Sequence, residues 1–395
     1  MSRYDFDQLI DRQGTCAVKI DAMEQRFGRA DLTSMWIADM DFAVCPEIVE
    51  SLKQRINHPI YGYAVASDSY WQSIINWLDH RHNFKVSREE ITYIPGVVKG
   101  IALVVNFFTK PGDKIVIQPP VYHPFKNVVE GNDRIVLNNP LILTENYRYE
   151  MDFDHLEKIF VEEKPKMMIL CNPHNPGGIR WDNASLLRLA SLCKAHNVLV
   201  ISDEIHADLV LYGKRHHQFA SISQDASDIC ITLGAPSKTF NIPGLVSSWV
   251  IIQNQQLREP FFKWLSVNEF DATTFTATIA TEAAYTLGEQ WLDEALEYIE
   301  GNIDFLIDYC ATNIPQIKPV RPQASFLIWL DCRELGLDQE QLVDLFVNKA
   351  RLALNDGKMF GAEGEGFMRM NIACPRSVLN NALASLAHAV KSLAQ

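Results

Sequence analysis

Lys238 is the residue of this sequence whose position most favours chemistry. It follows an apolar segment, 229–233, that predicts a short buried strand, and a Gly-Ala-Pro turn and Ser237 lie between them. Helix-breaking residues come next, at Asn241, Pro243 and Gly244. Lys238 is therefore expected on a loop. Partial burial there lowers the pKa of the amine and makes it a nucleophile or a base, whereas a lone loop lysine is more often a solvated charge.

Polar residues also follow the other predicted strands. The sequence predicts these strands at 91–95, 114–122, 166–178 and 198–202. Each strand ends in or beside residues that can contact a ligand, namely Gly96, Tyr122, Asn172 with Asn175, and Asp203. Ligands of open parallel sheets bind outside the carboxyl ends of the strands. The repeated pattern therefore predicts one pocket, which also contains Ser237 and Lys238.

Helical patterns alternate with these strands, as at 97–108 and 185–196. Apolar strands spaced by helices favour an α/β protein whose mainly parallel sheet is covered on both faces. Beyond about residue 257 the elements become fewer and less regular. They comprise a helical stretch at 276–310, strands at 324–332 and 366–375, and helices at 339–350 and 378–393. This change predicts a smaller α+β domain, joined by the polar, irregular segment 1–35.

Composition and charge exclude several classes of partner. The 395 residues carry a formal net charge of -13, so neither nucleic acid nor an anionic membrane is expected as the main partner. No apolar stretch approaches the length of a membrane span, and the N-terminus lacks a hydrophobic signal region. The eight cysteines form no CxxC pair, which favours reduced thiols in a cytoplasmic protein. No metal is expected, because the cysteines and the pair His216–His217 lack ligand spacing, and this pair is expected in a surface loop.

The residue types at the predicted pocket suit one cofactor, pyridoxal phosphate. A lysine forms a Schiff base with it, and a carboxylate such as Asp203 keeps its pyridine nitrogen protonated. The helix opened by Gly96 offers backbone amides to a phosphate, which the Ser237 hydroxyl would also bind. An aromatic ring stacks on the cofactor and an amide binds its 3-oxygen, roles that suit Tyr122 and Asn175. In isolation, each of these residues also has a purely structural interpretation, such as a helix cap for Asp203.

Three motifs carry a family resemblance: SDEIH at 202–206, NPHNPGG at 172–178 and SKTFN at 237–241. They resemble the fold-type I, aspartate-aminotransferase superfamily of pyridoxal-phosphate enzymes over nearly the whole chain. Four more motifs narrow the resemblance to the MalY/PatB group of cystathionine β-lyases (C–S lyases). These are WIADMDF at 36–42, Tyr61-Gly62-Tyr63, PPVYHPF at 119–125 and MRMNIACPR at 368–376.

The resemblance implies an architecture and a set of site residues. The fold would be a mainly parallel seven-stranded sheet sandwiched by helices in a large domain, 46–270, with a smaller α+β domain from 1–45 and 271–395. Lys238 would be the Schiff-base lysine and Arg369 would bind the substrate α-carboxylate. Tyr61 would reach the phosphate of the neighbouring subunit, so a homodimer would have active sites at its interface. The implied cofactor-binding set is Gly96, Val97, Val98, Tyr122, Asn175, Asp203, His206, Ser237, Lys238 and Tyr61, with Ala38, Asn175, Tyr61 and Arg369 for the substrate and Lys238, Tyr122 and Asp203 for catalysis.

The sequence departs from the general aminotransferase pattern at two positions. His206 stands where many aminotransferases have a tyrosine, three residues after the pyridine aspartate. Val246 stands where many have an arginine that binds the cofactor phosphate, whereas the GLxxS form of 244–248 is expected in the lyase group. Losing that cation should weaken retention of the free aminated cofactor, which a transaminase must hold between half-reactions. A β-lyase does not release its cofactor in that way, so it should tolerate the loss better.

The expected activity is therefore α,β-elimination. A cytoplasmic β-lyase of this kind would cleave L-cystathionine or a related cysteine thioether to a thiol, pyruvate and ammonia, with a place in methionine biosynthesis. Two alternatives stay open at this point. The same pocket could run an amino-acid transamination, which needs a keto acid for turnover. The chain could also be a regulatory protein that uses the fold as a binding module.

Overall fold

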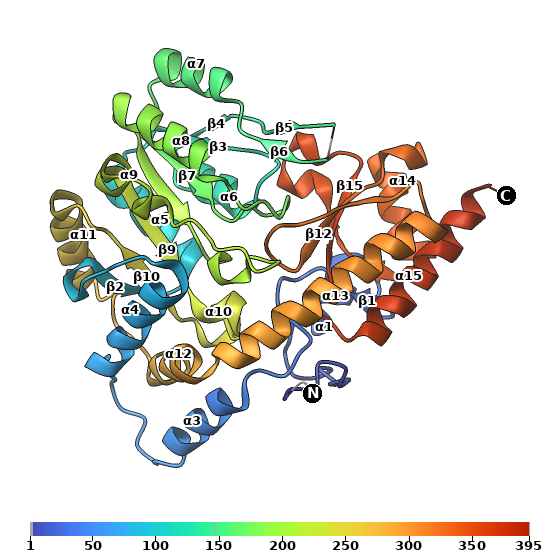
Figure 1. Ribbon diagram of the computed structural model, residues 1–395, viewed down its shortest axis with the longest axis horizontal. Helices are drawn as coiled ribbons and strands as arrows, with labels where there is room; N and C mark the ends of the chain where they lie inside the picture. Colours follow the sequence, from blue (N-terminus) through green and yellow to red (C-terminus); the bar gives the residue numbers. More distant parts are fainter. Residues whose placement is uncertain (1–2, 146, 395) are drawn as a thin grey trace.

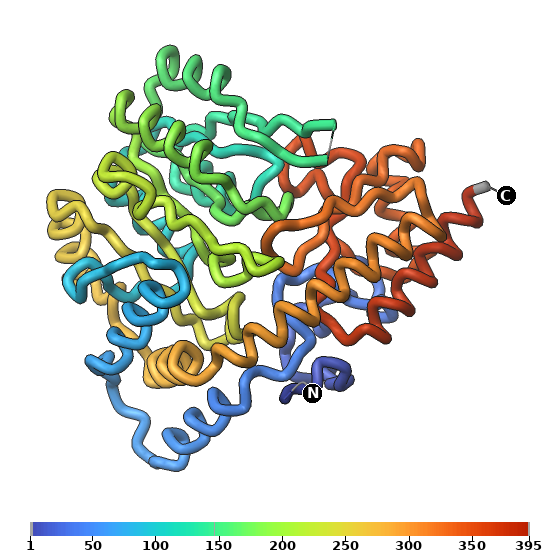
Figure 2. Tube along the Cα trace, in the orientation of Figure 1, coloured from blue at the N-terminus to red at the C-terminus, as the bar shows by residue number. Residues whose placement is uncertain are grey.

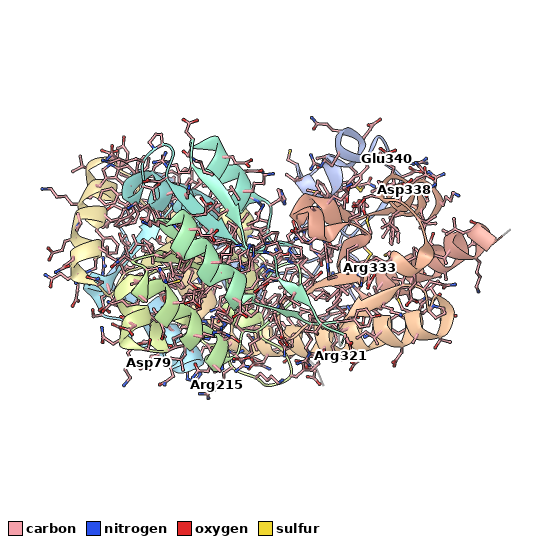
Figure 3. The ribbon with its side chains drawn as sticks, turned by 90° about the horizontal axis from the view of Figure 1, so that it is seen from above. Asp79, Arg215, Arg321, Arg333, Asp338 and Glu340 are labelled. Carbon is pink, nitrogen blue, oxygen red and sulfur yellow. The ribbon has the colours of Figure 1, made fainter. Side chains whose placement is uncertain are left out.

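The computed structural model describes residues 3–145 and 147–394, so the outermost residues of the expected N-terminal and C-terminal segments lie outside the description. Figure 1 shows two parts, a larger one built on a central sheet and a smaller one that holds most of the C-terminal quarter of the chain. Seen from above in Figure 3, Asp79 and Arg215 belong to the larger part, and Arg333 and Asp338 to the smaller one.

The central sheet has seven strands, and β10 is the strand that runs antiparallel to both its neighbours. The other pairings along β9, β8, β7, β3 and β4 are parallel. In spatial order the strands are β2 (Ile91–Ile94), β10 (Ser248–Ile251), β9 (Cys230–Gly234), β8 (Leu199–Asp203), β7 (Met167–Cys171), β3 (Lys114–Ile117) and β4 (Ile135–Asn138). The predicted fold class, a mainly parallel seven-stranded α/β sheet, is confirmed.

Helices cover both faces of this sheet, because its strands are apolar on both sides. Neighbouring residues of β8 show this: Val200 packs into one apolar cluster and Ile201 into the other. The Ile201 cluster contains Ile101 and Phe261, from two of the covering helices. The helices of the larger part include α3 (Pro46–Ile56), α4 (Asp68–His82), α5 (Val97–Phe108), α6 (Pro124–Gly131), α7 (Phe153–Glu163), α8 (Asn183–Ala195), α9 (Gln224–Ile229) and α11 (Gln255–Val267).

The smaller part is organised around a four-stranded antiparallel sheet. Its strands are, in spatial order, β11 (Lys318–Val320), β12 (Leu327–Asp331), β15 (Phe367–Asn371) and β14 (Asn355–Asp356). The helices α14 (Gln339–Asp344) and α15 (Arg376–Lys391) lie in the same part. A further antiparallel pair, β5 (Ile142–Leu143) and β6 (Tyr149–Glu150), follows the central sheet's edge strand in the chain.

The N-terminal segment packs against the smaller part. Its β1 (Thr33–Ser34) pairs in parallel with β13 (Leu352–Ala353), and Figure 2 shows the blue N-terminal tube beside the orange and red C-terminal one. The segment was expected to be irregular throughout, but two short helices form in it, α1 (Val18–Asp21) and α2 (Met23–Phe27). Both are a turn or little more, which is too short for a clear periodic pattern in the sequence.

The helical stretch expected at 276–310 is two helices, α12 (Phe275–Leu287) and α13 (Glu289–Asn313), which meet at Gly288. A Cβ at Gly288 would lie 2.6 Å from the ring of Phe240 and 2.6 Å from the carbonyl oxygen of Ala284. Glycine is therefore required where the two helices pass this close to Phe240. From this junction α13 runs across the molecule into the smaller part (Figure 1).

Lys238 lies on a single helical turn, α10 (Pro236–Thr239), and not on an irregular loop as expected. Pro236 occupies the first helical position, where its fixed φ favours a helix and its missing N–H costs nothing. The breakers that follow end this helix after one turn instead of preventing it. A similar difference occurs at 339–350, where α14 passes into a wider π-helical turn, Leu345–Lys349.

Gly234→Ala should destabilise the protein. A Cβ at Gly234 would lie 2.2 Å from Cη2 of Trp249, a ring that is 4% exposed and cannot move freely. Overpacking of this kind costs about 1–3 kcal/mol of the free energy of unfolding, which denaturant titration measures. Gly131→Ala is the matched control, since a Cβ there meets no atom within 4 Å. Equal stability of the two variants would contradict the packing argument.

Candidate functional site

One cavity of about 310 Å³ lies at the carboxyl ends of the central strands. The end of β7, the end of β8 and the turn α10 all contribute to its wall. The structure brings most of the expected site residues together there, and these are Ala38, Gly96, Val97, Val98, Tyr122, Asn175, Asp203, His206, Ser237 and Lys238. Residues from five strand ends and from the N-terminal segment thus face a single space.

Two expected residues lie outside the wall of this cavity. Arg369, on β15, contacts it through Asn175, because its Nη1 donates a hydrogen bond to Oδ1 of Asn175 at 3.0 Å. Tyr61 lies in the connection between α3 and α4 and is 59% exposed. Its ring stacks on Phe275 with the centroids 5.7 Å apart. Within this chain, therefore, Tyr61 is a surface residue.

Lys238 is held in a buried environment that disfavours its charge. Its Nζ donates a hydrogen bond to the carbonyl oxygen of Ala38 at 2.6 Å. Burial, followed by the positive charge of Arg369, lowers the pKa of Lys238 to about 8, although Asp39 and Asp203 act in the opposite direction. A substantial neutral fraction of the amine is therefore present near neutral pH, as a nucleophile or base needs.

Asp203 is a buried carboxylate at the end of β8, and it is 3% exposed. Burial raises the pKa of Asp203 to about 7, and the neighbouring charge of Glu204 adds to this rise. The backbone N–H of Ile205 donates to Oδ1 at 3.2 Å and opposes it. A cationic nitrogen in the cavity would supply the counter-charge that this carboxylate lacks, and a protonated pyridine ring has such a nitrogen.

Arg369 is a buried guanidinium whose hydrogen-bond acceptors are uncharged. Besides Asn175 it donates through Nη2 to the carbonyl oxygen of Trp36 at 3.0 Å and to Oδ1 of Asn355 at 2.6 Å. Its Nε is buried and has no acceptor in the structure. Burial lowers the pKa of Arg369 to about 10. A carboxylate is the natural ligand of such a guanidinium, since it supplies both charge and paired acceptors.

The start of α5 forms a cradle for an anion. Gly96 has φ +112°, a conformation that only glycine adopts easily, and a Cβ at this position would meet no atom within 4 Å. The first N–H groups of this twelve-residue helix, from Val97 onward, have no partner within the helix. Together with the Ser237 hydroxyl, which lines the same space, they suit a phosphate group.

Val246 forms part of the cavity wall next to this cradle. Its φ of +51° is left-handed, which is strained for a β-branched residue. The hydroxyl of Tyr93 donates to the Val246 carbonyl at 2.8 Å and fixes this conformation. The position at which many aminotransferases have an arginine is thus an apolar part of the wall.

His206 presents a neutral imidazole to the cavity. Burial, followed by the charge of Lys238 and that of Arg369, lowers the pKa of His206 to about 3. Its Nδ1 is buried without a hydrogen-bond partner in the structure. This orphaned polar atom, the unpaired Nε of Arg369, the carboxylate of Asp203 and the anion cradle are together the features that a bound pyridoxal phosphate and an amino acid would satisfy. The cavity therefore fits the expected cofactor.

The prediction that His216 lies in a surface loop is wrong. Its side chain is buried, and its Nε2 pairs with Oε2 of Glu204 at 2.7 Å, with both side chains 0% exposed. Glu204 also accepts hydrogen bonds from the Ser202 hydroxyl at 2.8 Å and from the Phe219 N–H at 2.9 Å. The adjacent acid in the SDEIH motif was the available sequence signal for a buried partner.

Several residues of the cavity wall were not expected: Pro95, Lys99, Cys171, Ile205 and Pro243. Cys171 closes β7, where nothing in its sequence context separates it from an ordinary core residue. Within residues 3–145 and 147–394, no group of three or more His, Cys, Asp or Glu side chains could hold a metal ion. In the same part of the chain, no helix is long and apolar enough to cross a membrane.

A lysine beyond a central strand, a buried aspartate at the next strand end and an anion cradle define the architecture of fold-type I pyridoxal-phosphate proteins. The chain belongs to the aminotransferase class I and II family, whose model matches residues 31–386. It is 43% identical over 379 residues to cystathionine beta-lyase PatB of Bacillus subtilis, covering 96% of this chain and 98% of PatB. It is 33% identical over 393 residues to protein MalY of Escherichia coli, covering 99% and 100%.

Solved structures of pyridoxal-phosphate proteins support the same family assignment. A putative aminotransferase with bound PLP from Clostridium difficile superposes with a TM-score of 0.95 at 43% identity, covering 98% of this chain and 100% of that one. A C–S lyase with bound PLP from Staphylococcus hominis superposes with a TM-score of 0.92 at 33% identity, covering 98% of each chain. The predicted membership of the MalY/PatB group is confirmed.

The variant Asp203→Asn should stabilise the cofactor-free protein, and more strongly as the pH rises. The unfolded carboxyl ionises at about pH 4, whereas in the folded state the pKa of Asp203 is about 7. Between about pH 4 and pH 7 the carboxyl of Asp203 is therefore protonated in the folded state and ionised in the unfolded state. The free energy of unfolding of the wild type falls as the pH rises through this range. Asparagine does not ionise, so its advantage should grow by about 2 kcal/mol between pH 5.5 and pH 8.

Denaturant titration at the two pH values measures this difference. Asp225→Asn is the control, because Asp225 is an exposed carboxylate on α9. An Asp203→Asn gain that is equal at both pH values would show that the charge of Asp203 does not limit stability.

Proposed function

We propose that this protein is a pyridoxal-phosphate-dependent carbon–sulfur β-lyase that cleaves L-cystathionine or a related cysteine thioether to a thiol, pyruvate and ammonia. The observation that carries the proposal is the placement of Lys238 with a depressed pKa in the cavity that Asp203 also lines, with Arg369 behind Asn175. The names of PatB and of the Staphylococcus hominis C–S lyase support this reaction. Cystathionine as a substrate is supported by the name of PatB and by that of the 29% identical cystathionine beta-lyase of Corynebacterium glutamicum.

The cofactor is pyridoxal phosphate, which supplies an electron-accepting ring next to the substrate Cα. Lys238 would hold it as a Schiff base, and Asp203 would bind its pyridine nitrogen. Asn175 and the neutral His206 would contact the 3-oxygen. The phosphate would lie at the start of α5, against Gly96 and its neighbours Val97, Val98 and Ser237, and Tyr122 would stack on the ring.

The protein's own groups would carry the proton and bind the substrate. Arg369 binds the α-carboxylate through paired donors and thereby fixes the orientation of the Cα–H bond. Lys238 accepts the Cα proton at Nζ, because about one amine in ten is neutral at pH 7 when the pKa is about 8. Burial raises the pKa of Tyr122, so its phenol stays protonated and can donate a proton to the departing sulfur.

Transamination remains the alternative activity of this pocket. Val246 argues against it, since it gives the cavity wall an apolar side chain where the general aminotransferase pattern has an arginine that helps to retain the aminated cofactor between two half-reactions. A regulatory role would need a partner surface, and the complete set of Lys238, Asp203 and Arg369 favours an active enzyme.

The assembly is proposed to be a homodimer with active sites at the subunit interface. Large apolar side chains in the connection between α3 and α4 support this, since an unpaired surface seldom exposes so many together. They are Ile60 at 67% exposure, Tyr61 at 59%, Tyr63 at 112% and Val65 at 88%. Tyr61 of each subunit would reach the phosphate bound by the other.

The division of the chain and its setting are also proposals. Residues 46–270 would form the large domain, and residues 1–45 with 271–395 the small one, which the separate central and four-stranded sheets support. All eight cysteines are free in the part of the chain that the structure describes, which agrees with a cytoplasmic location. Methionine biosynthesis is the proposed context.

The purified yellow protein should release pyruvate steadily from cystathionine, together with a thiol, when no keto acid is added. Coupled reduction of pyruvate and a thiol reagent measure the two products. Lys238→Ala should fold and lose turnover by more than about 1,000-fold, because both the anchor and the base are gone. If turnover requires a keto acid, the protein is a transaminase, and retained turnover in Lys238→Ala would remove Lys238 from both roles.

Subunit exchange tests the shared active site. Tyr61→Ala and Lys238→Ala should each be nearly inactive as homodimers. In a mixed dimer one site would contain a wild-type Lys238 from one subunit and a wild-type Tyr61 from the other. Random exchange of equal amounts should therefore restore about a quarter of the wild-type activity. An equal mixture of Lys238→Ala and Asp203→Asn is the control and should restore no activity, because both residues belong to the same subunit's site. If the Tyr61→Ala and Lys238→Ala mixture also restores none, Tyr61 is not shared across the interface.

A further inference from the structure

The segment 36–42 is bonded both to the smaller part and to the region of Lys238, and we call it the strap. From the smaller part, Asn371 donates through Nδ2 to the carbonyl oxygens of Ile37 and Asp39, each at 2.6 Å. From the region of Lys238, Asn241 donates to the carbonyl oxygens of Met40 and Phe42 at 3.0 and 2.9 Å. In the middle of the strap lies Ala38, the residue whose carbonyl accepts the hydrogen bond from Lys238.

Two acidic side chains of the strap bind two basic ones of the N-terminal segment. Arg12 donates to both oxygens of Asp39, at 3.0 and 2.8 Å, and to Oδ1 of Asp41 at 2.8 Å. Lys19 donates to Oδ2 of Asp41 at 2.8 Å and to the carbonyl oxygen of Asp39 at 3.1 Å. These four side chains, which we call the strap cluster, carry two positive and two negative charges.

Lys19 is the most deeply buried member of the strap cluster, with a side chain that is 1% exposed, against 16% for Asp39 and 23% for Asp41. A buried ammonium is costly unless it is paired, so its position is fixed by these acceptors. Its backbone binds the strap as well, since the Lys19 carbonyl accepts from Nε1 of Trp36 at 3.0 Å.

We propose that Lys19 is a positioning residue for Lys238, because it fixes the strap whose Ala38 carbonyl holds the lysine amine and keeps the strap cluster electrically neutral beside it. This inference rests on the proposed role of Lys238 as the Schiff-base lysine. Lys19 does not line the cavity, and it acts through Asp39, Asp41 and the strap backbone.

The electrostatic part of the proposal has a definite sign. Charged or titratable groups face Lys238 from β8, from β15, from the strap and from α1, and they are Asp203, His206, Arg369, Asp39 and Lys19. Removing the Lys19 charge leaves the strap cluster with a net negative charge, which favours a proton on the Lys238 nitrogen. Removing the Asp41 charge leaves it net positive and disfavours that proton.

The test is a pH titration of the holoenzyme, followed through the absorbance of the cofactor bound to Lys238, which changes when the Schiff-base nitrogen takes up a proton. Lys19→Met should move the midpoint upward by about half a pH unit, and Asp41→Asn should move it downward. The double variant Lys19→Met/Asp41→Asn restores neutrality and should return the midpoint toward that of the wild type. Lys19→Arg keeps the charge and should leave it in place.

Asp31→Asn is the matched control, since it removes an exposed carboxylate from the same N-terminal segment whose partners, Arg29 and Arg351, are both at least partly exposed. An unchanged midpoint in both single variants, or shifts in the same direction, would overturn the proposal. If Lys19→Met does not fold, the other two variants decide. A lower midpoint in Asp41→Asn together with an unchanged midpoint in Lys19→Arg supports the proposal, and any other result overturns it. Borohydride reduction of the wild type and peptide mapping test Lys238 separately, so a label elsewhere refutes the proposed function instead.

Discussion

The central cavity of this protein is surrounded by ionisable side chains whose charges are not fully paired within the chain. Asp203 and Arg369 are buried and Lys238 is partly buried, and burial is the first cause that moves the pKa of each toward its neutral form. Removing these groups from water costs free energy, because the protein does not replace all of their interactions with water. Ligands of opposite charge would recover that free energy. The sheet, the strap and β15 serve to hold these three groups at the edges of one space, close enough for a single small ligand to satisfy them.

The residues directly behind them are paired. Asp208 accepts hydrogen bonds from Nε1 of Trp77 at 2.8 Å and from the Thr239 hydroxyl at 2.8 Å, and its Oδ1 lies 2.7 Å from Nε2 of His82. Although burial opposes the charged form, the hydrogen bond with His82 and the charge of that ring hold the pKa of Asp208 below its usual value. Thr239 follows Lys238 in the chain. The hydrogen bonds to Asp208 therefore anchor the turn that carries Lys238, while the side chains that line the cavity keep unsatisfied groups.

The sequence predicts the order of the main elements well, because apolar strands and amphipathic helices leave a periodic pattern. The helix at 97–108 has the bounds expected for it. Short elements were harder, since a single turn such as α10 has no period and depends on the contacts of Pro236 and Phe240. Site residues at strand ends, such as Asp203 and Asn175, were predictable from chemistry and from motifs. The pairing of Lys19 with Asp41 was not, because residues that are distant in sequence meet only in the folded chain.

The long helix α13 has a mechanical consequence. Its 25 residues span about 38 Å, from Gly288 beside Phe240 to the far side of the smaller part. A rotation of about 5° at the Gly288 end displaces the other end by about 3 Å. Phe240, two residues beyond Lys238, packs against that pivot. The helix thus links the smaller part, which carries Arg369 on β15, to the turn that carries Lys238, so a tilt of α13 would displace both ends of this connection together.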